Sequence, residues 1–109
     1  MLAKANRLTV RTDFLTTVRN GRRAHVGALT GFLYSTPESN PPRFGFQVSR
    51  RVGGSVERHR VVRQLRHLVA PWVARTPDSA MVVIRPDHKV EDYSSDVDAL
   101  MERLVGSVK

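Results

Sequence analysis

The chain contains no cysteine, which excludes disulfide bonds and thiolate metal sites and fits a reducing cytoplasm. No apolar run approaches the roughly 18 residues that suggest a membrane-spanning helix. The first seven residues, Met1 to Arg7, lack the apolar core of a secretory signal. The sequence therefore predicts a cytoplasmic protein with no membrane partner.

Acidic residues are also scarce. Ten Asp and Glu stand against eighteen Lys and Arg, fifteen of which are Arg, for a net charge of +8. Residues 1–66 hold thirteen basic and three acidic residues, whereas residues 67–109 hold five basic and seven acidic ones. A positive field on one part of a small domain attracts polyanions. The arginine excess favours nucleic acid over a membrane, because guanidinium binds phosphate with two donors and stacks on bases.

The length of 109 residues and the absence of a linker predict a single domain over residues 1–109, and hydrophobic periodicity and turn residues predict its elements. The expected helices span residues 13–21, 55–75 and 90–105, and the expected strands span residues 28–35, 44–48 and 79–85. Pro71 should end or bend the second helix near Ala70. The order α-β-β-α-β-α indicates an α+β sandwich of a small sheet with helices.

The second helix carries the functional signal. One face is apolar, with Val61, Leu65, Leu68 and Trp72, and the opposite side is basic, with His59, Arg60, Arg63, Arg66 and His67. Glu57 is the only acidic residue between positions 39 and 77. A solvated helix face normally mixes both signs of charge. The one-sided charge therefore favours a nucleic-acid surface over a merely solvated one.

At this point the sequence resembles the protein subunit of bacterial ribonuclease P, over roughly residues 6–105. The opening segment 6–21 and the strand and basic loop 43–53 are similar to the family's pattern. The helix resembles the family signature Arg-Asn-Arg-x-(Lys/Arg)-Arg-x-x-Arg, and the positions that match are Arg58, Arg60, Arg63 and Arg66. His59 replaces the asparagine and Val62 replaces a basic residue. Histidine still donates hydrogen bonds, whereas valine cannot bind phosphate.

The resemblance implies an α+β fold with a left-handed β-α-β crossover, against the general right-handed preference. It also implies a ribonucleoprotein in which a catalytic RNA removes the 5′ leader of precursor tRNA. Mg²⁺ would be held through the RNA, no cofactor would be bound by the protein alone, and no obligatory protein partner is expected. By resemblance, the catalytic RNA would be bound by Arg50, Arg51, Arg58, His59, Arg60, Arg63 and Arg66. A separate leader cleft between the first helix and the sheet would be lined by Phe14, Val18 and Phe32.

No self-contained active site is visible in the sequence. The four histidines show no metal-ligand spacing with acidic residues, and Ser55 with His59 lacks a third group to orient the imidazole. We therefore expect no catalytic residue and no metal site in the protein.

Three other functions compete with this interpretation. A structural RNA-binding protein of ribosomal-protein type would bind RNA without any role in cleavage. An autonomous nuclease would need carboxylates beside the basic surface. A helix-turn-helix DNA-binding protein would need a second helix just before Ser55, where a strand is expected.

Overall fold

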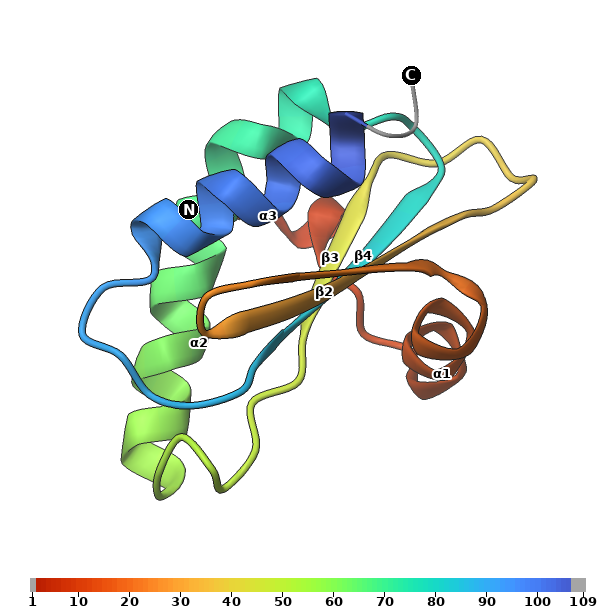
Figure 1. The fold of residues 1–109 in the computed structure, drawn as a ribbon. Coiled ribbons are helices and arrows are strands. Elements are labelled where there is room, and N and C mark those ends of the chain that lie inside the picture. Colours follow the sequence, from red (N-terminus) through yellow and green to blue (C-terminus); the bar gives the residue numbers. More distant parts are fainter. Residues whose placement is uncertain (1, 107–109) are drawn as a thin grey trace.

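The computed structural model describes residues 2–106 and has an α+β architecture (Figure 1). Its helices are α1 (Arg11–Asn20), α2 (Ser55–Val69) and α3 (Ser94–Gly106). Its strands are β1 (Arg22–Val26), β2 (Leu29–Ser35), β3 (Arg43–Phe46) and β4 (Ala80–Pro86). Two 3₁₀ segments, η1 (Lys4–Asn6) and η2 (Ala70–Arg75), complete the elements. The predicted fold class is confirmed.

The four strands form one sheet in the order β1-β2-β4-β3. β1 pairs with β2, and β2 with β4, in antiparallel fashion, whereas β3 and β4 are parallel. Because adjacent parallel strands need a crossover, α2 forms the connection of a β-α-β unit between β3 and β4. This unit sets α2 beside β3, at one edge of the sheet.

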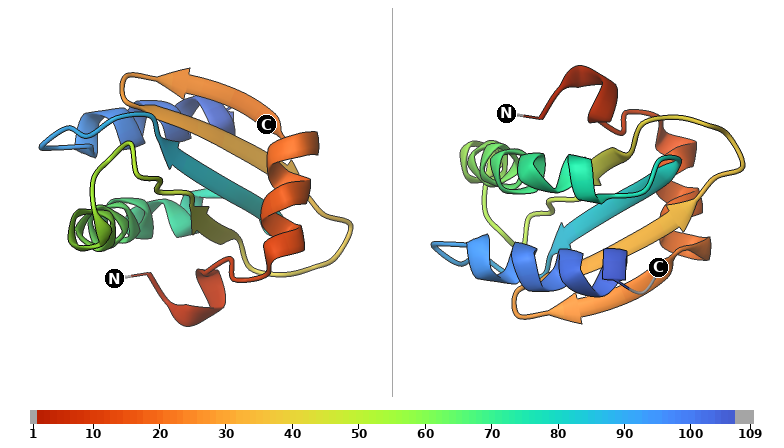
Figure 2. Two further views of the ribbon diagram at one scale, coloured as in Figure 1. Left: turned by 90° about the horizontal axis from the view of Figure 1, so that it is seen from below. Right: turned by 90° about the horizontal axis from the view of Figure 1, so that it is seen from above.

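The two faces of the sheet are covered differently (Figures 1 and 2). Alternate residues of a strand point to opposite faces. Leu33 belongs to the larger core, which also contains Leu65 of α2 and Leu100 of α3. Its neighbour Phe32 belongs to a smaller cluster on the other face, against which Phe14 of α1 packs. The single helix α1 thus covers one face, and α2 and α3 cover the other.

The predicted break in the second helix is confirmed. α2 ends at Val69 and the chain continues as η2, with Pro71 near its start. Proline lacks the backbone N–H that an α-helix would use at this position. Trp72 of η2 is buried, and its indole Nε1 donates to Asp98 Oδ1 at 3.0 Å. The break therefore turns the chain so that η2 packs against α3.

The predicted element order lacked one strand, β1, and was wrong there. The segment Arg22-Arg23-Ala24-His25-Val26 has no run of apolar residues, because β1 is an edge strand that buries little. The third helix also begins later than predicted, at Ser94, whose backbone N–H donates to Asp92 Oδ1 at 2.8 Å. Within residues 2–106, every helix is too short or too polar to cross a membrane.

Candidate nucleic-acid interface

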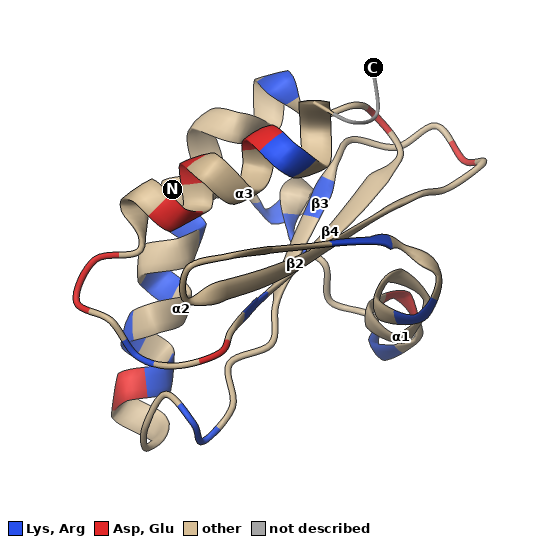
Figure 3. Cartoon of the chain, viewed as in Figure 1, with Lys and Arg blue, Asp and Glu red and all other residues tan. Residues whose placement is uncertain are grey.

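Helix α2 presents the basic surface that its sequence predicts (Figure 3). Val61 and Leu65 are buried in the larger core, so the apolar side of the helix faces the sheet. Exposed positions on the other side are His59, Arg60, Arg63 and His67, while Arg58 and Arg66 are half-buried. The basic side of α2 is therefore accessible to a partner from His59 to His67.

The loop before α2 adds two more cations. Arg50 and Arg51 are exposed, while the next residue, Val52, is 3% exposed and packs in the larger core. Gly53 has a φ of +145°, and a Cβ there would lie 2.9 Å from the Cβ of Glu57. That backbone conformation and that close approach both require glycine. The loop is thus fixed against the first turn of α2, with its two arginines outward.

The start of α2 suits an anion. The helix begins after Gly54, and no side chain caps its first turn. The first backbone N–H groups of a helix have no partner within the helix and carry partial positive charge. A phosphate at this point would gain these donors in addition to the neighbouring arginines.

Glu57 is the only acidic residue of helix α2. Its carboxylate lies 2.8 Å from Lys89 Nζ and 3.5 Å from Arg60 Nη1. The hydrogen bond from Lys89, and the positive charges of Lys89 and Arg60, hold the pKa of Glu57 below its ordinary value of 4.5. Glu57 is therefore ionised at neutral pH, and it offsets part of the charge of Arg60.

A groove runs between α2, β3 and the N-terminal segment, and we call it the α2–β3 groove. Its hollow of about 420 Å³ adjoins two further hollows along α2, of about 240 and 490 Å³, which share His59 and Val62 with it. The lining has two kinds of side chain. The apolar ones include Phe14, Phe46 and Val62, and the basic ones include Lys4, Arg7, His59 and Arg66.

The described residues bring no three metal-ligating side chains together. One histidine does contact a carboxylate, since His25 Nδ1 lies 3.3 Å from Asp87 Oδ2. Thr30 Oγ1 lies 3.1 Å from the same nitrogen. A nucleophile–histidine–acid relay needs the two partners on different ring nitrogens. This contact links strand β1 to the end of β4 and is not arranged for catalysis.

A family comparison decides the assignment. A sequence model described as Ribonuclease P matches residues 2–108 of the chain. The chain belongs to the ribonuclease P protein family. The ribonuclease P protein component of Streptomyces avermitilis is 42% identical over 97% of both chains. That of Thermobifida fusca is 43% identical over 86% of this chain and 70% of its own length.

Solved structures of ribonuclease P proteins share the fold. The protein from Thermotoga maritima aligns with a TM-score of 0.66, 20% identity and 94% coverage of both chains. The protein from Staphylococcus aureus aligns with a TM-score of 0.72, 17% identity and 97% coverage of both chains. At these identities the likeness concerns the fold, and it agrees with the α+β class that the sequence predicts.

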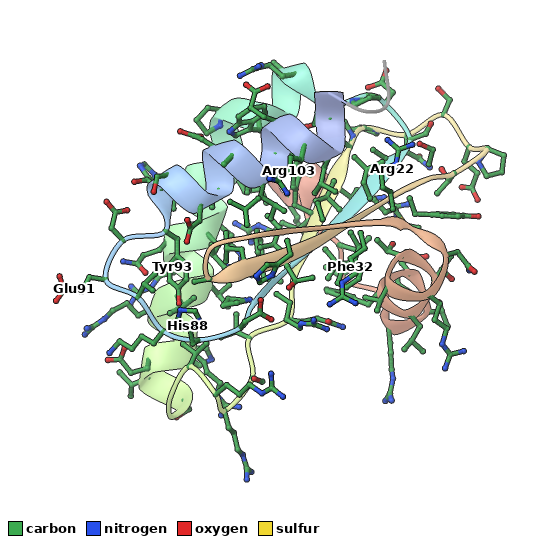
Figure 4. All side chains as sticks on the ribbon, viewed as in Figure 1. Arg22, Phe32, His88, Glu91, Tyr93 and Arg103 are labelled. Atoms are coloured by element: carbon green, nitrogen blue, oxygen red, sulfur yellow. The ribbon has the colours of Figure 1, made fainter. Side chains whose placement is uncertain are left out.

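Within this ribonuclease P fold, the three predicted cleft residues meet at the smaller core cluster, because Phe32 belongs to it and Phe14 and Val18 both pack against it. Of the three, Phe14 also lines the α2–β3 groove, whereas the lining of that groove does not include Val18 or Phe32. Phe32, labelled in Figure 4, is 4% exposed in that cluster. The Arg85 guanidinium lies 5.6 Å from the centre of the Phe32 ring. Little of the Phe32 ring is open for stacking, so the leader-binding role of Val18 and Phe32 stays a prediction.

Sequence reasoning missed several residues of the groove in this ribonuclease P protein. Lys4 and Arg7 come from the N-terminal segment, which reaches the groove because Arg7 forms a parallel bridge with Phe44 of β3. Phe46 was predicted only as part of the strand over residues 44–48. The two basic residues near the start were a usable signal, but their pairing with β3 was not visible in the sequence.

Proposed function

We propose that this protein is the protein subunit of the ribonuclease P holoenzyme, which binds the catalytic RNA and the 5′ leader of precursor tRNA. Family membership supports the holoenzyme assignment. The observation that carries the proposal is the basic face of α2 lying beside a groove with an apolar floor. The first feature suits a folded RNA and the second suits a single strand.

The α2 surface is assigned to the catalytic RNA. Exposed arginines are suited to phosphate contacts, which position a protein on RNA. Among the α2 arginines, Arg60 forms an ion pair within the helix, with Glu57. An exposed i,i+3 pair of this kind stabilises a helix by about 0.2–0.5 kcal/mol. A hydrogen bond to a charged group contributes about 1.5–3 kcal/mol when well made. Phosphate therefore outcompetes Glu57 for Arg60.

The α2–β3 groove is assigned to the leader. Proteins hold single strands by combining a positive channel for the backbone with apolar or aromatic surfaces for the bases. Lys4 and Arg66 supply the positive rim, and Phe14, Phe46 and Val62 supply the floor. A paired RNA stem would hide its bases from such a floor, so the groove favours the unpaired segment of a precursor.

The RNA is expected to perform the hydrolysis. Mg²⁺ held through the RNA would supply the activated water and stabilise the developing charge. The protein's part is electrostatic and positional, because a net charge of +8 reduces the repulsion between two polyanions. The protein should thus lower the Mg²⁺ concentration that the reaction needs.

Reconstitution tests this function. The catalytic RNA of the same organism is incubated with 5′-labelled precursor tRNA over a Mg²⁺ series, with and without the protein. We expect the protein to lower both the Mg²⁺ requirement and the KM for the precursor. RNA binding without any effect on cleavage would indicate the structural, ribosomal-type alternative. Cleavage by the purified protein after all RNA is removed would indicate an autonomous nuclease.

A matched pair of variants tests the groove. Val62→Glu places a carboxylate on its floor, whereas Val56→Glu places one on the same helix at a position 72% exposed and outside the groove. With saturating protein in the holoenzyme, Val62→Glu should weaken precursor binding by about 1 kcal/mol or more, from charge repulsion. Mature tRNA, which has no leader, should bind as before. Equal losses for both variants, or for both tRNAs, would contradict the leader assignment.

A further inference from the structure

A second group of arginines lies away from α2, at the junction of α1 and β1. We call it the α1–β1 corner, and it consists of Arg19, Arg22 and Arg23. Arg19 lies in the last turn of α1, Arg22 and Arg23 begin β1, and all three are exposed. Among residues 2–106, none of them forms an ion pair with a carboxylate. The corner is therefore an uncompensated positive surface.

The two arginines of β1 lie on opposite faces of the sheet edge. β1 is an edge strand, in which Arg22 pairs with Leu33 and Arg23 pairs with Phe32. Opposed residues of antiparallel strands share a face. Leu33 lies in the core under α2 and α3, and Phe32 lies in the cluster under α1. Arg22 and Arg23 consequently project from opposite faces of one edge.

The corner and α2 lie on different parts of the molecule. β1 and β3 are the two outer strands of the sheet, and α2 with its groove adjoins β3. Figure 3 shows one basic group along α2 and another at α1 and the start of β1. Figure 4 places Arg22 well away from α2. An RNA that reaches both groups must pass around the protein.

Ordinary structural roles explain only part of this charge. A cation near a helix C-terminus contributes about 0.3–1 kcal/mol, which accounts for Arg19 alone. Charged residues on an edge strand also discourage pairing with another chain. Neither role explains why three arginines lie within five residues, or why no acidic residue neutralises them. The nearest acid in the sequence, Asp13, is engaged by Arg43 at 3.3 Å.

The chemistry of the corner selects its partner. Among the described residues, the large exposed apolar side chains are Val10, Leu15 and Val56, none of them aromatic. Bases of a single strand therefore find no exposed aromatic ring to stack on here. Arginines on both sides of an edge suit the phosphates of a folded RNA, whose bases are already paired.

We propose that the α1–β1 corner is a second RNA-binding surface, which contacts the phosphate backbone of a folded segment of the catalytic RNA. This inference rests on the proposed function and adds a separate contact to it. Two linked contacts raise the overall affinity, because the second forms at high effective concentration once the first is made. The protein then binds two parts of one RNA, one through α2 and the other through the α1–β1 corner.

Salt-dependent binding of the full chain to the catalytic RNA tests the corner. The double variant Arg22→Gln, Arg23→Gln is compared with wild type, after circular dichroism shows that both are folded. Each lost phosphate contact lowers the slope of log affinity against log salt by about 0.7–0.9. We expect the slope to fall by about 1.4–1.8 in total and the affinity at low salt to fall about threefold per arginine.

Two controls separate this effect from general charge. Arg75→Gln also removes one charge, but at a site where Glu102 already pairs with the arginine at 3.0 Å. It should change the slope by less than half of the change that the double corner variant causes. Arg22→Lys with Arg23→Lys keeps the charge and should keep most of the slope.

The outcomes distinguish the two proposals. Wild-type binding with an unchanged slope in the double variant overturns the second surface and leaves the proposed function standing. Unchanged binding to the catalytic RNA, together with weaker binding of mature tRNA by the holoenzyme, also overturns it, because the corner would then contact the substrate. If wild-type protein does not bind the catalytic RNA at all, the proposed function itself fails.

Discussion

Helices α2 and α3 pack on the same face of the sheet and use the same means to do so. Leu65 of α2 and Leu100 of α3 are both completely buried in the larger core. The exposed faces of the two helices differ in the sign of their net charge. α2 exposes several arginines and histidines, whereas α3 exposes Asp98 and Glu102 and a single arginine, Arg103. Figure 3 shows this contrast along the two ribbons.

The difference separates what folds the protein from what it binds. The apolar stripes of both helices decide packing, and packing is indifferent to the sign of the charge on the far side. On the α3 side, Arg75 is paired with Glu102 at 3.0 Å and stacks 4.0 Å from the centre of the Trp72 ring. On α2, Arg63 has no carboxylate partner within residues 2–106. A cation without a partner in the protein is available for one outside it.

The largest expected effect concerns the shared role of the two helices. Leu65→Ala and Leu100→Ala should each lower the free energy of unfolding by about 2–5 kcal/mol, because each leaves a cavity in the same core. Urea denaturation followed by circular dichroism measures both. A large loss for one and almost none for the other would show that the two helices do not contribute equally to the fold.

The next effect concerns their outer faces. Arg60→Ala with Arg63→Ala should lower affinity for the catalytic RNA at least tenfold, or about 1.4 kcal/mol, because two phosphate donors are lost. Glu102→Ala on α3 is the control and should leave that affinity nearly unchanged. Filter binding at a fixed salt concentration measures both. Similar losses for the two variants would remove the distinction between the helices.

The smallest effect concerns the one acid on the basic face. Glu57→Gln should raise affinity for the catalytic RNA by up to about threefold, because it frees Lys89 and Arg60 from exposed pairs of modest strength. A fall in affinity would instead show that Glu57 is needed to hold Arg60 or the preceding loop in place.

The same carboxylate gives a pH test. Because its pKa is lowered in the folded protein, mainly by the hydrogen bond from Lys89, its contribution to stability is present above pH 4.5. That contribution is lost as the pH falls below this value and through the folded pKa. Wild type should therefore lose more stability than Glu57→Gln on acidification in this range. Equal losses in thermal melts would show that the pair does not stabilise the fold.

Much of the fold follows from local sequence patterns. The apolar alternation around Phe44 and the continuous run 81–84 predict β3 and β4, and the helical periodicity from Ser55 predicts α2. β1 escaped prediction because an edge strand with exposed arginines has the composition of a loop. Its pairing with β2 is decided by backbone hydrogen bonds, to which the side chains contribute little.

The candidate site divides in the same manner. The basic stripe of α2 was predictable, because residues of one helix face are fixed by the helical repeat. The α2–β3 groove was not, because its walls come from segments that are distant along the chain, such as Arg7, Phe14 and Arg66. Phe32 shows the converse, since its strand position was foreseen while its degree of burial depended on how α1 packs.

The sequence by itself determined the fold class, the position of α2, the sign of its outer face and the family. These depend on periodicity, composition and a contiguous motif, which are properties of neighbouring residues. Only the tertiary structure decided which side chains line the groove, how much of Phe32 is exposed and where Arg22 and Arg23 project. The reason is physical: these properties depend on sheet register and on packing between elements, which no single segment encodes.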